Sequence, residues 1–152
     1  VYQGSELWEF SLVDPDNRRP VDFAQRRRLL ADLDGGMVPP IDATGAAKLL
    51  VTSRALRARR DHPDAFDRYA PLPAFGDAAE HLIAVDRGGA IALATRLPVG
   101  LDAAGGWGDT LVILPGGIFT DLITGWRFDG GETPVRELLS RYPVALLIAD
   151  ER

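Results

Sequence analysis

The sequence contains no cysteine, which excludes a disulfide framework and a thiolate metal site. No apolar run approaches the roughly 18 residues that a transmembrane helix needs, and the first residues lack the basic and apolar regions of a signal peptide. We therefore expect no membrane partner and a cytoplasmic location. The 152 residues are too few for a complete (β/α)8 barrel, which takes about 250.

Lysine is almost absent, because Lys48 is the only lysine among 17 basic residues. The net charge of -5 makes the chain a poor candidate for binding a phosphate backbone, so we expect no nucleic-acid partner. The arginine run 26–28 is expected to be solvated or salt-bridged. Hydrophobic residues make up 46% and charged residues 26% of the chain, which is typical of a folded globular domain.

Catalytic and cofactor motifs are also missing. The sequence has no G-x-S-x-G and no H-E-x-x-H, and His62 and His81 have no partner at ligand spacing. The paired glycines do not form G-x-G-x-x-G and are interpreted as turns. We therefore expect no cofactor and no metal.

Two helices are predicted in the first part of the chain, over residues 20–33 and 44–61. Apolar residues recur there at three- and four-residue spacing, which is typical of a helix with one buried face. Asp22 and Thr44 are suitable N-cap residues, and Pro63 ends the second helix because it restricts the residue before it.

Short apolar runs separated by glycine and proline turns follow, and they predict strands. The first two strands are expected to pair as a hairpin, and so are the next two, which flank Pro115-Gly116-Gly117. Such short strands favour an antiparallel β-sandwich. The predicted strands are residues 81–86, 90–97, 110–114, 118–123 and 144–149.

The segment before the first helix, residues 2–19, is rich in carboxylates, amides, arginines and aromatic rings. This inventory is typical of a loop that binds a polyol, because such groups donate to and accept from vicinal hydroxyls. A surface loop tied by its own salt bridges explains the composition equally well. The candidate site residues are Tyr2, Gln3, Glu6, Asp14, Asp16, Asn17 and Arg18.

Six stretches of the sequence go beyond composition: YQGSEL (2–7), VDPDNRRPVDF (13–23), KLLVTSRALRARR (48–60), WGDT (107–110), LPGGIFTDLITG (114–125) and PVALL (143–147). They resemble the maltooligosyltrehalose synthases, a branch of the α-amylase family of glycoside hydrolases. The resemblance covers most of the chain, and DPDNRRPVDF is the most specific part of it.

The resemblance implies that the chain is an α+β fragment. Residues 1–65 would be the C-terminal end of the catalytic (β/α)8 barrel, with its last loop and helices, and residues 66–152 an antiparallel β-sandwich domain. The missing N-terminal barrel portion of the same protein would be its partner.

The resemblance also implies an activity on maltooligosaccharides. The enzyme would convert the reducing-end α-1,4 bond to an α,α-1,1 bond by retaining intramolecular transglucosylation, which belongs to trehalose biosynthesis. The family's catalytic carboxylates lie on earlier barrel strands and match no position here. We therefore assign no catalytic residue and expect the fragment alone to be inactive.

For the site, the resemblance implies that the loop after the last barrel strand lines the sugar. The residues that would contact the sugar or shape its site are Asp14, Asp16, Asn17 and Arg18. Tyr2, Gln3 and Glu6 would help to position the loop. A purely structural role for all of them stays open. A free-standing carbohydrate-binding β module and a fragment of another α-amylase-family hydrolase are the competing hypotheses.

Overall fold

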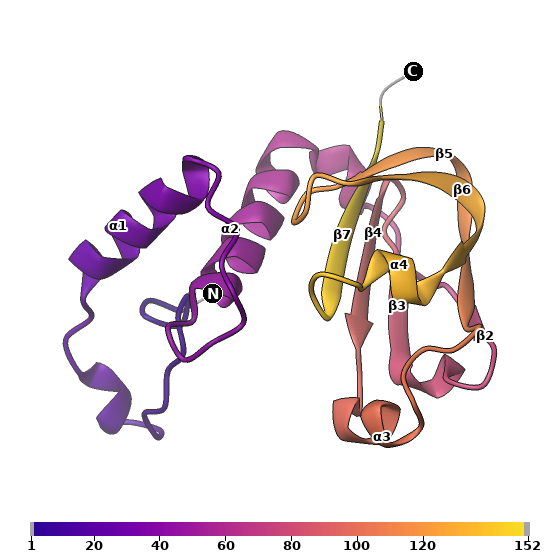
Figure 1. Cartoon of the computed structure of the whole chain (residues 1–152). Helices are drawn as coiled ribbons and strands as arrows, with labels where there is room; N and C mark the ends of the chain where they lie inside the picture. Colours follow the sequence, from indigo (N-terminus) through magenta and orange to yellow (C-terminus); the bar gives the residue numbers. More distant parts are fainter. Residues whose placement is uncertain (1, 151–152) are drawn as a thin grey trace. The chain divides into compact units, whose positions relative to one another are not determined.

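The computed structural model describes residues 2–150 (Figure 1). They form two compact units, residues 2–56 and 57–150. The two units meet within a helix, earlier in the chain than the boundary expected after residue 65. The assignment of the two parts to a barrel and a β domain stays a prediction. Among the described residues the helices are α1 (Phe23–Asp34), α2 (Ala46–Asp61), α3 (Pro98–Ala103) and α4 (Val135–Leu138), with 3-10 turns η1 (Asp16–Arg18), η2 (Pro63–Phe66) and η3 (Ala79–His81).

Helix α1 begins where its N-cap is satisfied. The carboxylate Oδ1 of Asp22 accepts a hydrogen bond from the backbone N of Gln25 at 2.8 Å, which satisfies one of the free donors of the first turn. At the other end Gly36 adopts φ +96°, a left-handed conformation that glycine takes without strain. The predicted first helix is confirmed, with its start moved to Phe23.

Helix α2 confirms the second predicted helix. The Thr44 hydroxyl Oγ1 accepts from the backbone N of Ala46, the first helical residue, at 3.2 Å. The backbone O of Gly45 accepts from the backbone N of Leu49 at 3.0 Å, so Gly45 is at the cap position and Thr44 binds the first turn from one residue earlier than expected. Leu49 and Leu50 are buried on one face of the helix. The helix ends before Pro63, which starts a 3-10 turn instead.

The single lysine of the chain joins the polar N-terminal segment to α2. The Lys48 ammonium Nζ donates to the backbone O of Leu7 at 3.0 Å and lies 5.3 Å from the centre of the Trp8 ring. The Trp8 indole Nε1 donates to the backbone O of Asp42 at 2.8 Å. Gly45 permits this approach, since a Cβ there would lie 2.8 Å from the backbone N of Trp8.

The second unit is built on one antiparallel sheet. Hydrogen bonds join the strands in the order β1-β3-β4-β7-β5-β2, and β6 pairs with β5. The antiparallel prediction is confirmed, but these strands form one continuous curled sheet where the sandwich prediction expected two sheets. The strands are β1 (Ala70–Pro71), β2 (Ala74–Phe75), β3 (Leu82–Asp86), β4 (Ala90–Thr95), β5 (Leu111–Asp121), β6 (Arg127–Pro134) and β7 (Val144–Ala149).

The strands form a single sheet because β5 is one long strand that pairs with β2, β6 and β7. The predicted hairpin at residues 115–117 is wrong, because the chain runs straight on through them as one strand with a bulge. Buried side chains fall on Val112 and Leu114 before the bulge and on Phe119 and Asp121 after it. The bulge shifts the alternation by one residue, so both halves of the strand keep facing the core.

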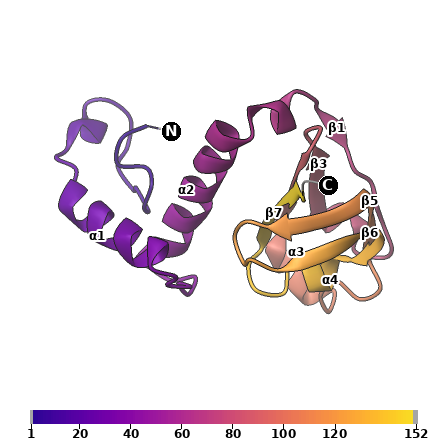
Figure 2. The same cartoon turned by 90° about the horizontal axis from the view of Figure 1, so that it is seen from above.

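The two ends of β5 pair with different neighbours, β2 near its start and β7 near its end. Strand β6 accompanies β5 on both sides of the bulge, and the two strands arch over α4 in Figure 1. Figure 2 shows the same two strands side by side across the unit. The true hairpin of this region is therefore β5–β6.

Helix α4 fills the concave side of the curled sheet. Val135, Leu138 and Leu139 are buried there, in one cluster with apolar side chains from β3, β4, β5 and β7. The cluster includes the following sheet residues: Ala84, Ile91, Leu93, Val112, Leu114, Phe119, Ala145 and Leu147. Burying a side chain of this size contributes about 1.5–3 kcal/mol, so this cluster is the main source of stability in the unit.

A buried carboxylate fixes the turn after β5. Asp121 is fully buried, and its Oδ1 accepts from the backbone N of Ile123 at 3.1 Å and of Leu146 at 3.0 Å. Its Oδ2 accepts from the hydroxyl of Thr124 at 2.6 Å and from the backbone N of the same residue at 3.2 Å. These four hydrogen bonds offset the cost of burying the carboxylate and tie the turn to β7.

Close packing between β6 and the bulge of β5 predicts which glycine in this region tolerates a side chain. A Cβ on Gly130 of β6 would lie 2.1 Å from the backbone O of Pro115, whereas one on Gly116 would have no atom within 4 Å. We expect Gly130→Ala to lower the free energy of unfolding by about 2 kcal/mol or more, since the strands must move apart.

Gly116→Ala is the matched control, and we expect it to change the free energy of unfolding by less than about 0.5 kcal/mol. Chemical denaturation of both variants measures the difference. Equal effects of the two substitutions would contradict the observed strand contact.

Candidate functional site

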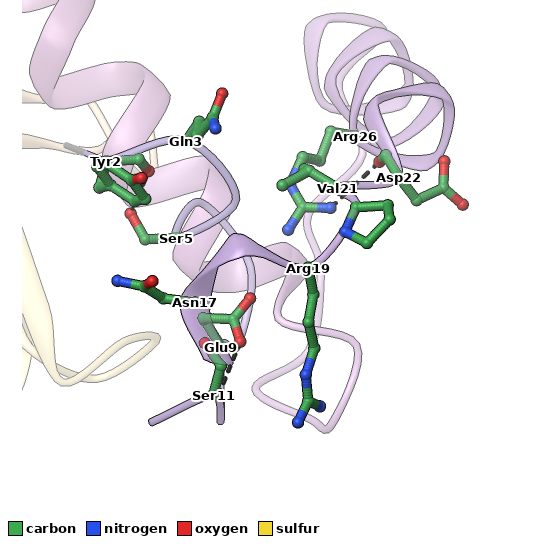
Figure 3. Close-up of a pocket in the computed structure, with 11 residues that line it drawn as sticks. Tyr2, Gln3, Ser5, Glu9, Ser11, Asn17, Arg19, Val21, Asp22 and Arg26 are labelled. Carbon is green, nitrogen blue, oxygen red and sulfur yellow. Dashed lines mark hydrogen bonds between the residues drawn. The ribbon is translucent and has the colours of Figure 1, made fainter. Parts of the chain in front are cut away.

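The polar N-terminal segment forms a cavity of about 270 Å³ against the start of α1 (Figure 3). In the figure Tyr2, Ser5 and Asn17 lie on one side of the cavity, and Arg19 and Arg26 on the other. All of its walls come from the first unit. The cavity is lined by Tyr2, Gln3, Ser5, Glu9, Ser11, Asn17, Arg19, Pro20, Val21, Asp22 and Arg26.

One wall of the cavity is held by the Arg26 guanidinium. Its Nε donates to the Glu6 carboxylate at 3.2 Å, and its Nη1 donates to the backbone O of Asp22 at 3.1 Å. Its Nη2 donates to the backbone O of Gly4. The same Glu6 oxygen accepts from the backbone N of Gly4 at 3.0 Å, so α1 holds the N-terminal segment through charge-assisted hydrogen bonds.

The outer part of the loop is held by its own ion pairs. Asp14 accepts two hydrogen bonds from the Arg18 guanidinium, one of them at 3.1 Å from Nη2. Asp16 pairs with Arg19 and accepts from the backbone N of Leu12 at 2.7 Å. Residues 12–19 therefore form a surface loop held by its own salt bridges, which is one of the two interpretations that the composition allowed.

The predicted site residues divide into two groups. Tyr2, Gln3 and Asn17 line the cavity. Glu6 does not line the cavity but accepts a hydrogen bond from Arg26, which does. Asp14, Asp16 and Arg18 also do not line it, and each forms an ion pair within the loop. The predicted residues that do not line the cavity are therefore Glu6, Asp14, Asp16 and Arg18. Contact of any of the seven residues with a ligand stays a prediction.

Several lining residues were not among the predicted candidates. Ser5, Glu9 and Ser11 lie in the same polar segment, so composition alone could not separate them from their neighbours. Asp22 was predicted as a helix cap and serves as one. Arg26 was expected to be solvated or salt-bridged, and its pairing with Glu6 confirms the salt bridge.

Two carboxylates of the segment, those of Glu9 and Asp16, have lowered pKa values. The Ser11 hydroxyl and backbone N, the latter at 2.8 Å from the carboxylate, lower the pKa of Glu9. For Asp16 the hydrogen bond from the backbone N of Leu12 lowers the pKa most, followed by Arg19. Both groups are therefore charged acceptors at neutral pH.

The lining groups indicate the kind of ligand the cavity can hold. Hydroxyls, amides, two carboxylates and two guanidinium groups surround a space that also contains the Tyr2 ring. Within residues 2–150, no cluster of three His, Asp or Glu side chains could hold a metal ion. This donor and acceptor set suits a neutral, hydroxyl-rich molecule. No helix in the described part of the chain is long and apolar enough to cross a membrane.

Comparison with known proteins gives long matches over almost the whole chain. A Mycobacterium tuberculosis protein (strain ATCC 25618 / H37Rv), provisionally named maltooligosyl trehalose synthase, is 46% identical over 153 residues, which cover 99% of this chain and 18% of that protein. The solved maltooligosyltrehalose synthase from Arthrobacter ramosus is 61% identical with a TM-score of 0.96, covering 99% of this chain and 20% of that one. The structure of DSM5389 glycosyltrehalose synthase is 27% identical with a TM-score of 0.71, over 99% of this chain and 18% of that chain. No protein-family model matches the chain.

The chain is therefore the counterpart of a segment of a much larger protein, and it spans about a fifth of the length of the relatives that it matches. These relatives are named as maltooligosyltrehalose synthases, and the chain is similar to them over nearly its full length. The resemblance stated from the sequence motifs is confirmed.

The lowered pKa values predict how the loop responds to acid. A carboxylate whose folded pKa is below its ordinary value stabilises the fold above that value, and this contribution is lost as the pH falls through the folded pKa. The ordinary values are 4.5 for Glu9 and 3.8 for Asp16. We therefore expect the loop to keep its structure at pH 5 and above and to lose these hydrogen bonds only at lower pH.

The amide NMR signals of Ser11 and Leu12 report the two titrations. We expect midpoints below pH 4.5 for Ser11 and below pH 3.8 for Leu12, and Asp16→Asn should abolish the second. Midpoints at or above the ordinary values would contradict the hydrogen bonds described.

Proposed function

We propose that the chain is part of an enzyme that converts the reducing-end α-1,4 linkage of a maltooligosaccharide to an α,α-1,1 linkage. The observation that carries this proposal is the match to the Arthrobacter ramosus synthase, at 61% identity over 99% of the chain. The enzyme would be an isomerase of the α-amylase family acting in trehalose biosynthesis, and we place it in the cytoplasm.

The proposed reaction is an intramolecular transglucosylation with retention. A carboxylate attacks the anomeric carbon to form a glycosyl-enzyme, while a carboxylic acid protonates the leaving sugar. The freed glucose turns over and attacks the intermediate with its own anomeric hydroxyl. We assign both carboxyl groups to the remainder of the protein, the barrel portion that would be this chain's partner, and none to this chain.

In this proposal the cavity of the first unit binds part of the glucan. The Tyr2 ring offers an apolar face, and the Gln3 and Asn17 amides can both donate to and accept from sugar hydroxyls. Because the freed glucose must stay bound while it turns, polar groups that hold it and exclude water favour transfer over hydrolysis. The ion-paired residues Asp14, Asp16 and Arg18 would shape this wall rather than carry out chemistry.

The product pattern from maltopentaose tests the proposed activity. The complete protein that contains this chain should remove reducing ends without shortening the saccharide, because the last glucose is transferred back to the same molecule. Reducing-sugar assay and chromatography of the same samples measure both quantities. Glucose and short maltodextrins as the main products would instead indicate an α-amylase-family hydrolase.

The 152-residue chain alone is expected to be inactive on maltopentaose, since the proposed catalytic carboxylates lie elsewhere. Overnight incubation of the purified chain, followed by the same chromatography, checks this. Any α,α-1,1-linked product would overturn the assignment of the catalytic groups. Binding of maltopentaose by the complete protein without any turnover would favour the carbohydrate-binding module.

A further inference from the structure

The three consecutive arginines of α1 differ in their surroundings. The Arg26 side chain is only 14% exposed and faces the cavity, whereas Arg27 and Arg28 are exposed. Successive helix residues point in different directions, so a single member of the run can reach the N-terminal segment. That member uses all three guanidinium nitrogens as donors, on Glu6, Gly4 and Asp22.

The contact with Gly4 controls the backbone at the cavity wall. Gly4 has φ +91°, and a Cβ there would lie 3.0 Å from a methyl group of Val21. Its backbone N donates to Glu6 and its backbone O accepts from Arg26. Both polar groups of this peptide segment are therefore fixed, and its neighbour Gln3 lines the cavity.

We propose that Arg26 is a positioning residue of the sugar site, which acts by holding Gly4 so that Tyr2 and Gln3 face the cavity before the glucan arrives. This inference rests on the proposed function and adds a residue that sets its binding geometry. Holding the wall in place lowers the ordering cost that the sugar would otherwise meet on binding.

The guanidinium shape is required for this role. A planar group with five N–H donors reaches a carboxylate and two backbone oxygens in different directions at once, whereas an ammonium is a point charge. Lysine at position 26 would therefore keep the charge opposite Glu6 and lose part of the hold on Gly4.

The test uses the complete synthase with maltopentaose as substrate and follows KM and kcat separately. In Arg26→Gln we expect KM to rise about tenfold, as for loss of one charge-assisted hydrogen bond, with kcat changed less than about twofold. Arg26→Lys should give an intermediate KM. Arg27→Gln removes the same charge from the same helix and should match the unaltered enzyme.

Glu6→Gln tests the same cavity wall with a second substitution, because Glu6 accepts hydrogen bonds from both Gly4 and Arg26. It should raise KM in the same direction, and combining it with Arg26→Gln should add little, because both substitutions release Gly4. If Arg26→Gln does not fold, Arg26→Lys and Glu6→Gln still give the KM comparison.

An unchanged KM in the folded Arg26 and Glu6 variants, with only a lower melting temperature, would overturn the positioning role and leave a purely structural one. A KM increase of the same size in Arg27→Gln would overturn it as well. If the unaltered protein forms no α,α-1,1 product, the proposed function itself fails, which is distinct from either result.

Discussion

The first unit depends on the Arg26 guanidinium, because hydrophobic burial cannot hold its N-terminal segment. Between Tyr2 and Asp22 only Gly4 and Leu7 are buried. The segment is instead held by hydrogen bonds from charged groups, of which those of Arg26 and Lys48 reach it from the two helices. Such bonds contribute about 1.5–3 kcal/mol each. The cavity exists because these contacts hold a polar segment open against α1.

The second unit is stabilised in the opposite way. One sheet curls around the apolar side of α4, and the bulge in β5 keeps buried side chains pointing inward on both sides of the bend. The fully buried carboxylate of Asp121 accepts four hydrogen bonds at the turn after β5. This unit supplies a packed core, while the first unit supplies the polar groups that can bind a ligand.

The sequence predicted the local features better than the long-range ones. Asp22 caps its helix as expected, and the Thr44 hydroxyl binds the first turn of the next helix, because these contacts depend on residues two or three positions away. The residues 115–117 have the composition of a turn, and only the pairing of the residues on either side of them with β6 decides that they form a bulge, against which Gly130 packs closely. The polar segment shows the same limit, since composition does not tell which carboxylates pair with arginines and which line the cavity. The motifs pointed to the right relatives because the similarity to them runs through nearly the whole chain.

The proposed function requires that the cavity between the N-terminal segment and α1 binds part of the glucan. A crystal structure of the complete protein with a bound maltooligosaccharide is the direct test. We expect a glucose unit in this cavity, with sugar hydroxyls within hydrogen-bond distance of the Gln3 or Asn17 amide. A glucan bound elsewhere in the complete protein, with no sugar atom near these residues, would contradict binding in this cavity.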